Sequence, residues 1–263
     1  MSDCIHAFVI CAYKEGKYLE DCVKSLVNQS TKSKIVISTS TPNSYISGIA
    51  DKYGIDVIVN DGPRGITEDW NFAYGNVDAK YLTIAHHDDY YHEDFAKDCI
   101  EYLENSGKPL ICFTDYAEAR EGRVVTTNKL LRTKRLMLWP LKFRIFRKSR
   151  FVRRRVLSLG DPICCPSVTF AKENLPEVIF ANHFRSDEDW EAWEKLSKLK
   201  GSFIYINKIL TYHRIHSDSE TTAILADNQR SAEDYEMYRK FWPKPIARFL
   251  TKRYSKSEQS NNL

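Results

Sequence analysis

Residues 79–95 read AKYLTIAHHDDYYHEDF, an apolar run that ends abruptly in two histidines and two aspartates. Residues Tyr81–Ala85 have the length and the partly β-branched character of a buried strand. The histidines and aspartates at 86–89 follow the C-terminal end of that strand, which is where ligands bind in open α/β sheets. Carboxylate oxygens at this place suit magnesium or manganese carrying a nucleotide diphosphate. The alternative is a polar loop that caps a helix over 92–105.

Strand and helix patterns alternate on both sides of this stretch. The strands are expected at Ala7–Ala12, Lys34–Ser38, Ile55–Val59 and Pro109–Thr114, and the helices at Lys17–Gln29, at Asn43–Tyr53 and from Thr67 onward. This alternation predicts an α/β chain with a doubly wound, mostly parallel sheet. No G-x-G-x-x-G or Walker sequence occurs, so neither a dinucleotide-binding fold nor a P-loop enzyme is supported.

The second half of the chain has shorter patterns. We expect a hairpin over Glu118–Thr127, a strand at Pro166–Phe170, a helix at Ser186–Lys198 with Ser186 as its N-cap, short strands at Phe203–Ile206 and Ile209–His213, and a helix from about Thr222 to Trp242. The buried stripe of the helix at 186–198 would be Trp190, Trp193 and Leu196. The last nine residues, SKSEQSNNL, have the composition of a disordered tail.

The positive charge of the chain is concentrated in one segment. The 263 residues carry a formal net charge of +4, but residues 132–155 contain eleven Lys or Arg and no acid, so the rest of the chain carries −7. Apolar side chains, among them Trp139, Phe143 and Phe146, interleave with these basic residues. Such a segment can lie on an anionic membrane surface, pack as a solvated helix, line a diphosphate site or bind nucleic acid. No recognised nucleic-acid-binding motif accompanies it, so no nucleic-acid partner is expected.

Cysteine usage and the N-terminus indicate the compartment. The seven cysteines form no C-x-x-C pair, and four of them are flanked by apolar residues, which is typical of reduced, buried thiols. Met1–His6 has no basic stretch followed by an apolar one, and no run approaches the ~18 apolar residues of a membrane span. We therefore expect a cytoplasmic protein without a spanning helix.

Five motifs resemble those of the family-2 glycosyltransferases, enzymes of the GT-A fold that transfer a sugar from a nucleotide donor with inversion. The first three, in the family's order, are AYKE at Ala12–Glu15, where the family has T-Y-N-E, GITEDWN at Gly65–Asn71, where it has G-x-x-x-A-R-N, and HHDD at His86–Asp89, where it has D-x-D-D. The last two are EDW at Glu188–Trp190, where the family has E-D-W/Y, and HRIH at His213–His216 followed by SDSETT, where it has R-x-H-x-x-S. Each motif alone is weak, but their order and spacing over residues 5 to about 220 make the resemblance specific.

The resemblance implies a nucleotide-sugar donor, UDP-linked by expectation, with manganese or magnesium on its diphosphate, and a glycan or lipid-linked acceptor. It also implies a part in bacterial surface-polysaccharide assembly, in the cytoplasm or peripherally on the inner face of the membrane through residues 132–155. Sugar transfer develops positive charge on the anomeric carbon and negative charge on the leaving diphosphate, and a divalent ion neutralises the latter.

Carried over residue by residue, the resemblance implies three groups of site residues. The donor-binding group is Ala12, Tyr13, Glu15, Ser40, Asp69, Asn71, His86 and Asp88. The metal-binding group is Asp88, Asp89 and His216. The catalytic group is Asp189, as the general base that deprotonates the acceptor hydroxyl, and Glu188, its nearest rival, which could bind acceptor hydroxyls jointly with it.

The chain departs from the family pattern where relatives usually touch the base, ribose or phosphate. His86 replaces the first aspartate of D-x-D, Ser38–Ser40 replaces an acidic segment, and Asp69-Trp70 replaces Ala-Arg. Trp70 is therefore either a core aromatic or a part of the donor site.

The domain organisation is expected to follow the motifs. We expect a GT-A domain at 1–220, with a nucleotide-sugar half at 1–115 and an acceptor half at 116–220 that includes the basic segment. A C-terminal helix and a disordered tail are expected at 221–263.

Two other functions remain open from the residues alone. A metal-dependent nucleotidyltransferase of related architecture usually has a glycine-rich loop after its first strand, whereas this chain has only Gly16 there. A basic membrane-surface binding module would explain residues 132–155 but would leave both acidic clusters without a role.

Overall fold

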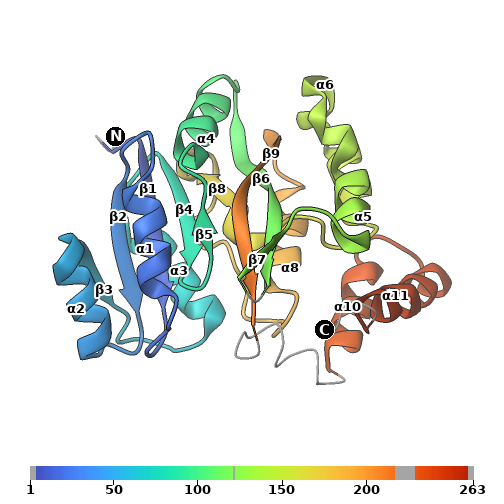
Figure 1. Ribbon diagram of the computed structural model, residues 1–263. Coiled ribbons are helices and arrows are strands. Elements are labelled where there is room, and N and C mark those ends of the chain that lie inside the picture. Colours follow the sequence, from blue (N-terminus) through green and yellow to red (C-terminus); the bar gives the residue numbers. More distant parts are fainter. Residues whose placement is uncertain (1–3, 121, 217–228, 260–263) are drawn as a thin grey trace.

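The computed structural model describes residues 4–120, 122–216 and 229–259, so the SDSETT segment at 217–222 and the expected helix start at 222–228 lie outside the described residues. The strands form one sheet in the order β3-β2-β1-β4-β8-β6-β9-β5, with β7 paired to β6 (Figure 1). They are β1 (His6–Ala12), β2 (Lys34–Thr39), β3 (Asp56–Val59), β4 (Tyr81–His86), β5 (Tyr90–Tyr91), β6 (Pro109–Arg120), β7 (Arg123–Val125), β8 (Val168–Ala171) and β9 (Ser202–Ile215).

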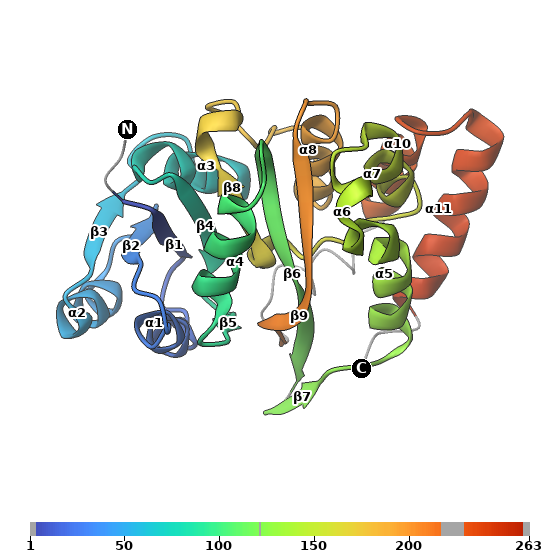
Figure 2. The same ribbon diagram turned by 90° about the horizontal axis from the view of Figure 1, so that it is seen from above.

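Helices cover both faces of the sheet, and Figures 1 and 2 place α2 and α11 at its opposite ends. The helices are α1 (Leu19–Val27), α2 (Ser44–Tyr53), α3 (Ile66–Asn76), α4 (Phe95–Glu104), α5 (Lys129–Leu138), α6 (Arg144–Arg147), α7 (Arg150–Leu157), α8 (Glu188–Leu196), α10 (Gln229–Arg239) and α11 (Lys244–Gln259). A short 3₁₀ turn, η1 (Trp139–Lys142), joins α5 to α6, and a second, η2 (Cys165–Ser167), precedes β8.

The strands of the first half are parallel, as the sequence predicts. β1 pairs in parallel with β2 and with β4, and β2 pairs in parallel with β3. Alternate side chains of β1 enter opposite cores: Ala7 and Val9 join the core of α3 and α8, whereas Phe8 and Ile10 join the core of α1, α2 and α4. A strand buried on both faces must be apolar throughout, which explains why it reads as one continuous run. The predicted doubly wound, mostly parallel sheet is confirmed.

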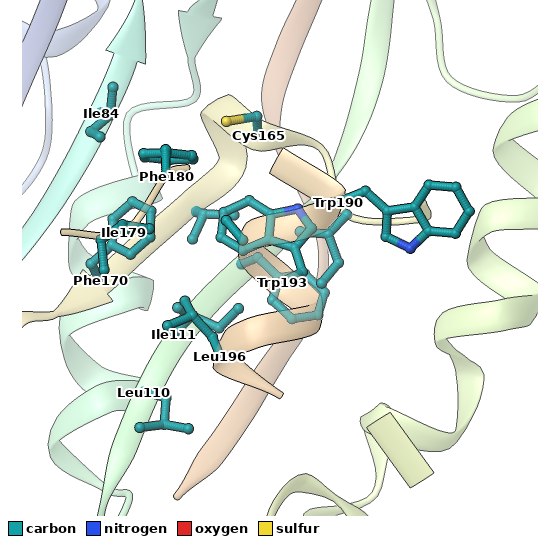
Figure 3. Close-up of a cluster of buried hydrophobic side chains, with 14 of the residues drawn as sticks. Ile84, Leu110, Ile111, Cys165, Phe170, Ile179, Phe180, Trp190, Trp193 and Leu196 are labelled. Carbon is teal, nitrogen blue, oxygen red and sulfur yellow. The ribbon is translucent and has the colours of Figure 1, made fainter. Parts of the chain in front are cut away.

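The core beneath the second half is built around the tryptophans of α8. Trp190 and Trp193 are fully buried and Leu196 nearly so, which confirms the predicted apolar stripe. Figure 3 shows Trp193 among the aromatic rings from β8 and the following loop; its ring centroid lies 6.0 Å from that of Phe170 and 6.3 Å from that of Phe180. These contacts hold α8, which carries the predicted base, against the sheet.

The long strands differ from the sequence prediction. β6 was expected to end at Thr114 but continues to Arg120, and the two strands expected over 203–213 are one strand, β9. The register between them shifts, because Thr114 pairs with Ile206 but Tyr116 pairs with Thr211, so β6 advances two residues while β9 advances five. The polar pair at 207–208 interrupts the apolar pattern in the sequence, and the irregularity absorbs it without ending the strand.

Two predicted helix caps and the predicted tail are also corrected. α3 begins after Gly65 rather than Thr67, and α8 begins after Asp187 rather than Ser186. Ser186 does not cap α8, because its hydroxyl donates a hydrogen bond to a carboxylate oxygen of Glu233 in α10, at 2.5 Å. A second C-terminal helix, α11, was not predicted, and residues 255–259 belong to it rather than to a disordered tail.

The basic segment 132–155 folds as α5, η1, α6 and α7, and part of its charge stabilises the fold. Arg153 is fully buried and donates to the carbonyl oxygens of Ser197 at 2.8 Å, of Gly201 at 2.7 Å and of Leu199. One guanidinium thus satisfies three carbonyl groups at and beyond the C-terminal end of α8, where a helix leaves such groups without intrahelical partners.

Replacing Arg153 with Ala should lower the free energy of unfolding by about 2–4 kcal/mol, because buried carbonyl groups lose their donors. Replacement with Lys should rescue little of the loss, since an ammonium lacks the planar fork that reaches all three oxygens. The matched control is Arg150→Ala in the same helix, an exposed site with an expected change within about 0.5 kcal/mol. Equal urea-denaturation curves for the Arg153 and Arg150 variants would contradict this role.

Candidate active site

The histidines and aspartates of the HHDD sequence gather at the C-terminal end of β4. His86 is the last residue of β4, and the turn at His87 and Asp88 leads through Asp89 into β5. One ligand atom from each of these three residues lies within 4.8 Å of the others. The structure therefore brings a nitrogen and two carboxylates together at the strand end that the sequence indicated.

Asp89 is a fully buried carboxylate that anchors the end of β9. It accepts a hydrogen bond from the backbone N–H of Arg214 at 2.8 Å, and its Oδ1 lies 3.1 Å from Nδ1 of His213. Although burial disfavours the charged imidazole, Asp89 and then Asp88 raise the pKa of His213 to about 9. His213 is thus protonated near neutral pH, and the buried negative charge has the partner that it requires.

Asp88 is held from the opposite side by two residues near the end of β9. Its Oδ2 lies 3.2 Å from Nε2 of His216, and its backbone carbonyl accepts a hydrogen bond from Nε of Arg214 at 2.9 Å. The Arg214 guanidinium in turn lies over the ring of Tyr18, at 3.9 Å from its centroid. Burial opposes ionisation of Asp88, but His86, His87 and His213 hold the pKa of this carboxyl below its ordinary value.

His86 has the properties of a ligand rather than of a structural histidine. Its Nε2 is buried and has no hydrogen-bond partner among the described residues. Its ring stacks on that of Trp70, with centroids 5.1 Å apart and an interplanar angle of 18°. Burial lowers the pKa of His86, which keeps the imidazole neutral and its lone pair available. The donor set of one neutral imidazole and two carboxylates fits a divalent cation such as manganese.

The loop after β1 contributes the AYKE residues. Ala12 ends β1 and is buried, whereas Tyr13 is half exposed and Glu15 is exposed. Lys14 adopts a left-handed backbone with φ of 52°, and its N–H donates to Oγ1 of Thr41 at 2.6 Å. This bond ties the loop after β1 to the loop after β2 at the same edge of the sheet.

Ser40 and Asp69, both predicted to bind the donor, contact each other. The Ser40 hydroxyl donates to Oδ2 of Asp69 at 2.7 Å, and the side-chain amide of Asn60 donates to Oδ1 at 2.7 Å. Asp69 thereby connects α3 to the loops after β2 and β3. Where the family has Ala-Arg, this chain thus has Asp69 at the start of α3, and the Asp69 carboxylate binds the two loops.

Asn71 and Trp70 connect α3 to the loop before α8. The Asn71 side chain donates to the carbonyl of Phe180 and accepts from the N–H groups of Ile179 and Phe180 at 3.2 and 3.0 Å. Trp70 packs against the core and against Phe180 as well as stacking on His86. Trp70 is therefore a partly buried core aromatic that also contacts His86, and its part in donor binding stays a prediction.

A second group of titratable residues surrounds Asp189 in the first turn of α8. Asp189 accepts from the N–H of Trp190 at 2.8 Å and is hydrogen-bonded to Asp161 of the turn before η2. Burial raises the pKa of Asp189, and burial together with Asp189 raises that of Asp161 well above the ordinary value. Asp161 thus keeps its proton to a higher pH than an ordinary aspartic acid does. Lys134 of α5 interacts with both carboxyls.

Glu188, the predicted rival of Asp189, is buried in the same turn. Its neighbour Asp187 is also buried, and burial and the nearby Asp234 of α10 raise the pKa of Asp187 well above the ordinary value. Three acidic side chains therefore crowd the N-terminus of α8, where the helix dipole favours negative charge.

The buried thiol of Cys164 interacts electrostatically with members of both groups. Burial raises the pKa of Cys164 well above its ordinary value, and the carboxylates of Asp89 and Asp189 both add to that rise. Lys134 influences His213 on one side and Asp189 on the other. Cys164 and Lys134 therefore interact electrostatically with members of both groups. A hollow of ≈ 710 Å³ adjoins the first group, and Tyr18, Arg214 and His216 line it.

Four residues at the site were not predicted as site residues. His213 and Arg214 are in the HRIH motif, but nothing in the sequence shows that they, rather than His216 alone, reach the aspartates. Asp161 is the first acid after a stretch without acids that begins at Gly122, and this isolation could have marked it in the sequence as a candidate site residue. Lys134 could not be singled out in the sequence, because its segment contains ten other basic residues.

Comparison with known proteins gives a family and several related folds. The sequence model of the family described as Glycosyl transferase family 2 matches residues 7–174 of the chain. No curated protein sequence gives a significant match.

Among solved structures, Staphylococcus aureus TarS in complex with UDP-GlcNAc is similar, with a TM-score of 0.65, 14% sequence identity, and coverage of 94% of this chain and 70% of that chain. A second is the mannosyltransferase PcManGT from Pyrobaculum calidifontis in complex with GDP-Man and Mn2+, with a TM-score of 0.61, 12% identity, and coverage of 95% and 69%. Both likenesses agree with the GT-A fold.

The Asp161–Asp189 pair should make stability depend on pH. Because folding raises the pKa of Asp161, the folded chain binds a proton that the unfolded chain has released, and stability falls as pH rises above the ordinary value of 3.8. Asp161→Asn should therefore raise the melting temperature by a few degrees near neutral pH, and the gain should shrink as pH falls toward 3.8.

Thermal unfolding at a series of pH values measures this effect, with Asp78→Asn, an exposed aspartate after α3, as the control. A melting temperature for Asp161→Asn that is unchanged or lower at every pH would show that the carboxyl is not a destabilising, proton-binding group.

Proposed function

The chain belongs to glycosyl transferase family 2, and we propose that this glycosyltransferase moves a sugar, with inversion at the anomeric carbon, from a UDP-linked donor to a glycan or lipid-linked acceptor. The single observation that carries the proposal is the convergence of His86, Asp88 and Asp89 at the C-terminal end of β4. A UDP-linked donor is supported by the UDP-GlcNAc complex of TarS, although PcManGT is in complex with GDP-Man.

The donor would lie along the C-terminal ends of β1, β2 and β4. The loops there carry the predicted donor residues, and Ser40 and Asp69 hold each other in place at this edge. A divalent ion held by Asp88 and Asp89, with His86 and His216 beside them, would neutralise charge on the leaving diphosphate. Asp88 suits this role because its carboxylate is ionised, and Arg214 fixes its backbone.

The acceptor hydroxyl would meet Asp189 from the other side of Cys164. Asp189 would take the proton as the hydroxyl attacks the anomeric carbon, and the protonated Asp161 beside it would donate a hydrogen bond to the carboxylate. A raised pKa suits a general base, because a stronger base removes the proton more readily near neutral pH. Glu188 is placed in the same turn to bind other acceptor hydroxyls.

The wider assignments follow from the same family resemblance. We assign residues 1–115 to the donor half, residues 116–220 to the acceptor half, and the reaction to bacterial surface-polysaccharide assembly on the cytoplasmic side of the membrane. Family membership stands against the nucleotidyltransferase alternative.

Asp88→Asn should lose more than about 100-fold of donor turnover, because an amide is a much poorer ligand for a divalent ion than a carboxylate. Wild-type protein with manganese should be stabilised against heat by the correct nucleotide sugar, and the variant should lose this shift. Asp78→Asn, which changes an exposed aspartate away from the strand ends, is the matched control. Full wild-type turnover in excess chelator would overturn the metal assignment.

Asp189→Asn should keep the donor- and manganese-dependent thermal shift but lose about 10²–10⁴-fold in transfer, because the amide still accepts from the N–H of Trp190 but takes up no proton. Glu188→Gln distinguishes the two acids, and its main effect should be on the KM for the acceptor. If Glu188→Gln abolishes turnover while Asp189→Asn spares it, the two roles are exchanged.

A further inference from the structure

The basic segment 132–155 has several apolar side chains that are exposed to solvent. We call the exposed apolar residues of the segment from α5 to α7 the α5–α7 surface; they are Leu136, Trp139, Phe143, Ile145, Phe146 and Phe151. Ile145 is 79% exposed, Leu136 74% and Phe151 73%. Soluble monomers rarely gather so many large apolar side chains in one exposed stretch, so such a surface marks an interaction.

The aromatic members of this surface are in contact with one another. The ring centroids of Trp139 and Phe143 lie 5.0 Å apart, and those of Phe143 and Phe146 lie 6.3 Å apart. These rings remain at least a third exposed although they pack together. They form one apolar cluster rather than scattered single residues.

The segment that carries the cluster has basic residues and no acid. No acid occurs between Gly122 and Gly160. Four basic residues of the segment are exposed and form no ion pair with any described residue; they are Arg132, Arg144, Lys148 and Arg150. By contrast, Arg135 pairs with Asp115 at 2.6 Å and Arg154 pairs with Glu194 at 2.7 Å. The fold therefore uses some of the positive charge internally and leaves four cations beside the apolar cluster.

Charge and side-chain type together select one occupant. A second copy of the chain would bring like charges together, which opposes self-association through this face. Single-stranded nucleic acid binds by stacking its bases on aromatic rings, which the most exposed residues, Ile145 and Leu136, do not provide. The interface of an anionic bilayer accepts aliphatic and aromatic side chains and attracts Lys and Arg. We propose that the α5–α7 surface docks the enzyme onto an anionic lipid bilayer.

The docking surface lies on the same helix as a residue of the site. Lys134 of α5 interacts with Asp161 and Asp189, whereas Leu136, two residues later, faces solvent. Docking through α5 would thus bring the acceptor side of the site close to the membrane. Within residues 4–120, 122–216 and 229–259 no helix is long and apolar enough to cross a bilayer, so the attachment would be peripheral.

Sedimentation of the full chain with vesicles tests the proposal. Wild-type protein should sediment with phosphatidylcholine–phosphatidylglycerol vesicles at low salt, much less at high salt, and little with phosphatidylcholine alone. The double variant Leu136→Glu/Ile145→Glu should lower the partition coefficient at least about tenfold. Lys148→Ala should lower it by about fivefold, the effect of one cation near the surface. The control is Val178→Glu, which adds a charge at a valine that is 63% exposed outside this segment.

The outcomes separate this proposal from the catalytic one. Loss of binding in the double variant, with donor hydrolysis and the Val178→Glu control unchanged, supports docking. Absence of wild-type binding to anionic vesicles at low salt overturns it, whatever the turnover. Binding that the double variant retains also overturns it. A dimer in sedimentation velocity that the double variant dissolves would instead assign the surface to contact between copies, and salt-sensitive binding of oligonucleotides in preference to vesicles would assign it to nucleic acid.

Discussion

The active end of this molecule depends on the burial of one negative charge. Asp89 has no exposure to solvent, and a carboxylate in that position is tolerated only when hydrogen-bond donors surround it. The donors come from His213 and the N–H of Arg214, 124 and 125 residues away along the chain. Satisfying Asp89 therefore fixes the end of β9 beside the end of β4. Once β9 is there, Arg214 and His216 reach Asp88, so the buried Asp89 positions the residues that hold the partly buried Asp88.

The two carboxylate groups have different electrostatic surroundings although they share a region. The histidines around Asp88 hold the pKa of its carboxyl below the ordinary value, whereas burial raises the pKa of Asp189. This separation suits a reaction that needs a cation ligand on one side and a proton acceptor on the other. Lys134 lowers the pKa of both Asp189 and His213, and it belongs to the segment that also carries the exposed apolar side chains. Some residues of the basic segment thus act on the titratable groups of the site, whereas others lie at the surface. The composition of the segment alone does not show which residues do which.

Local sequence patterns were sufficient for the parallel strands of the first half and for the position of HHDD at the end of β4. The C-terminal ends of parallel strands meet at one edge, so an apolar run followed by HHDD places its aspartates without any knowledge of the remainder. The partners of Asp89 could not be found in this way, because a contact across 124 residues leaves no periodic trace. The cap of α8 was wrong because Glu233, from a later helix, takes the Ser186 hydroxyl that local preference assigned to capping. α11 was missed because its apolar side chains do not all face inward: Ala247 is fully buried, but Ile246 and Phe249 are exposed.

The register shift between β6 and β9 determines which way the end of β9 faces. Across that interval β9 has an odd number of extra residues, and side chains alternate from one face of a strand to the other. The position of His213 and Arg214 beside Asp89 depends on how many residues this irregular stretch contains. Shortening it by one residue, with the earlier pairing unchanged, would bring a different residue of β9 opposite Tyr116 and would move His213 away from Asp89. The length of the stretch at 207–210 is therefore part of the geometry of the site.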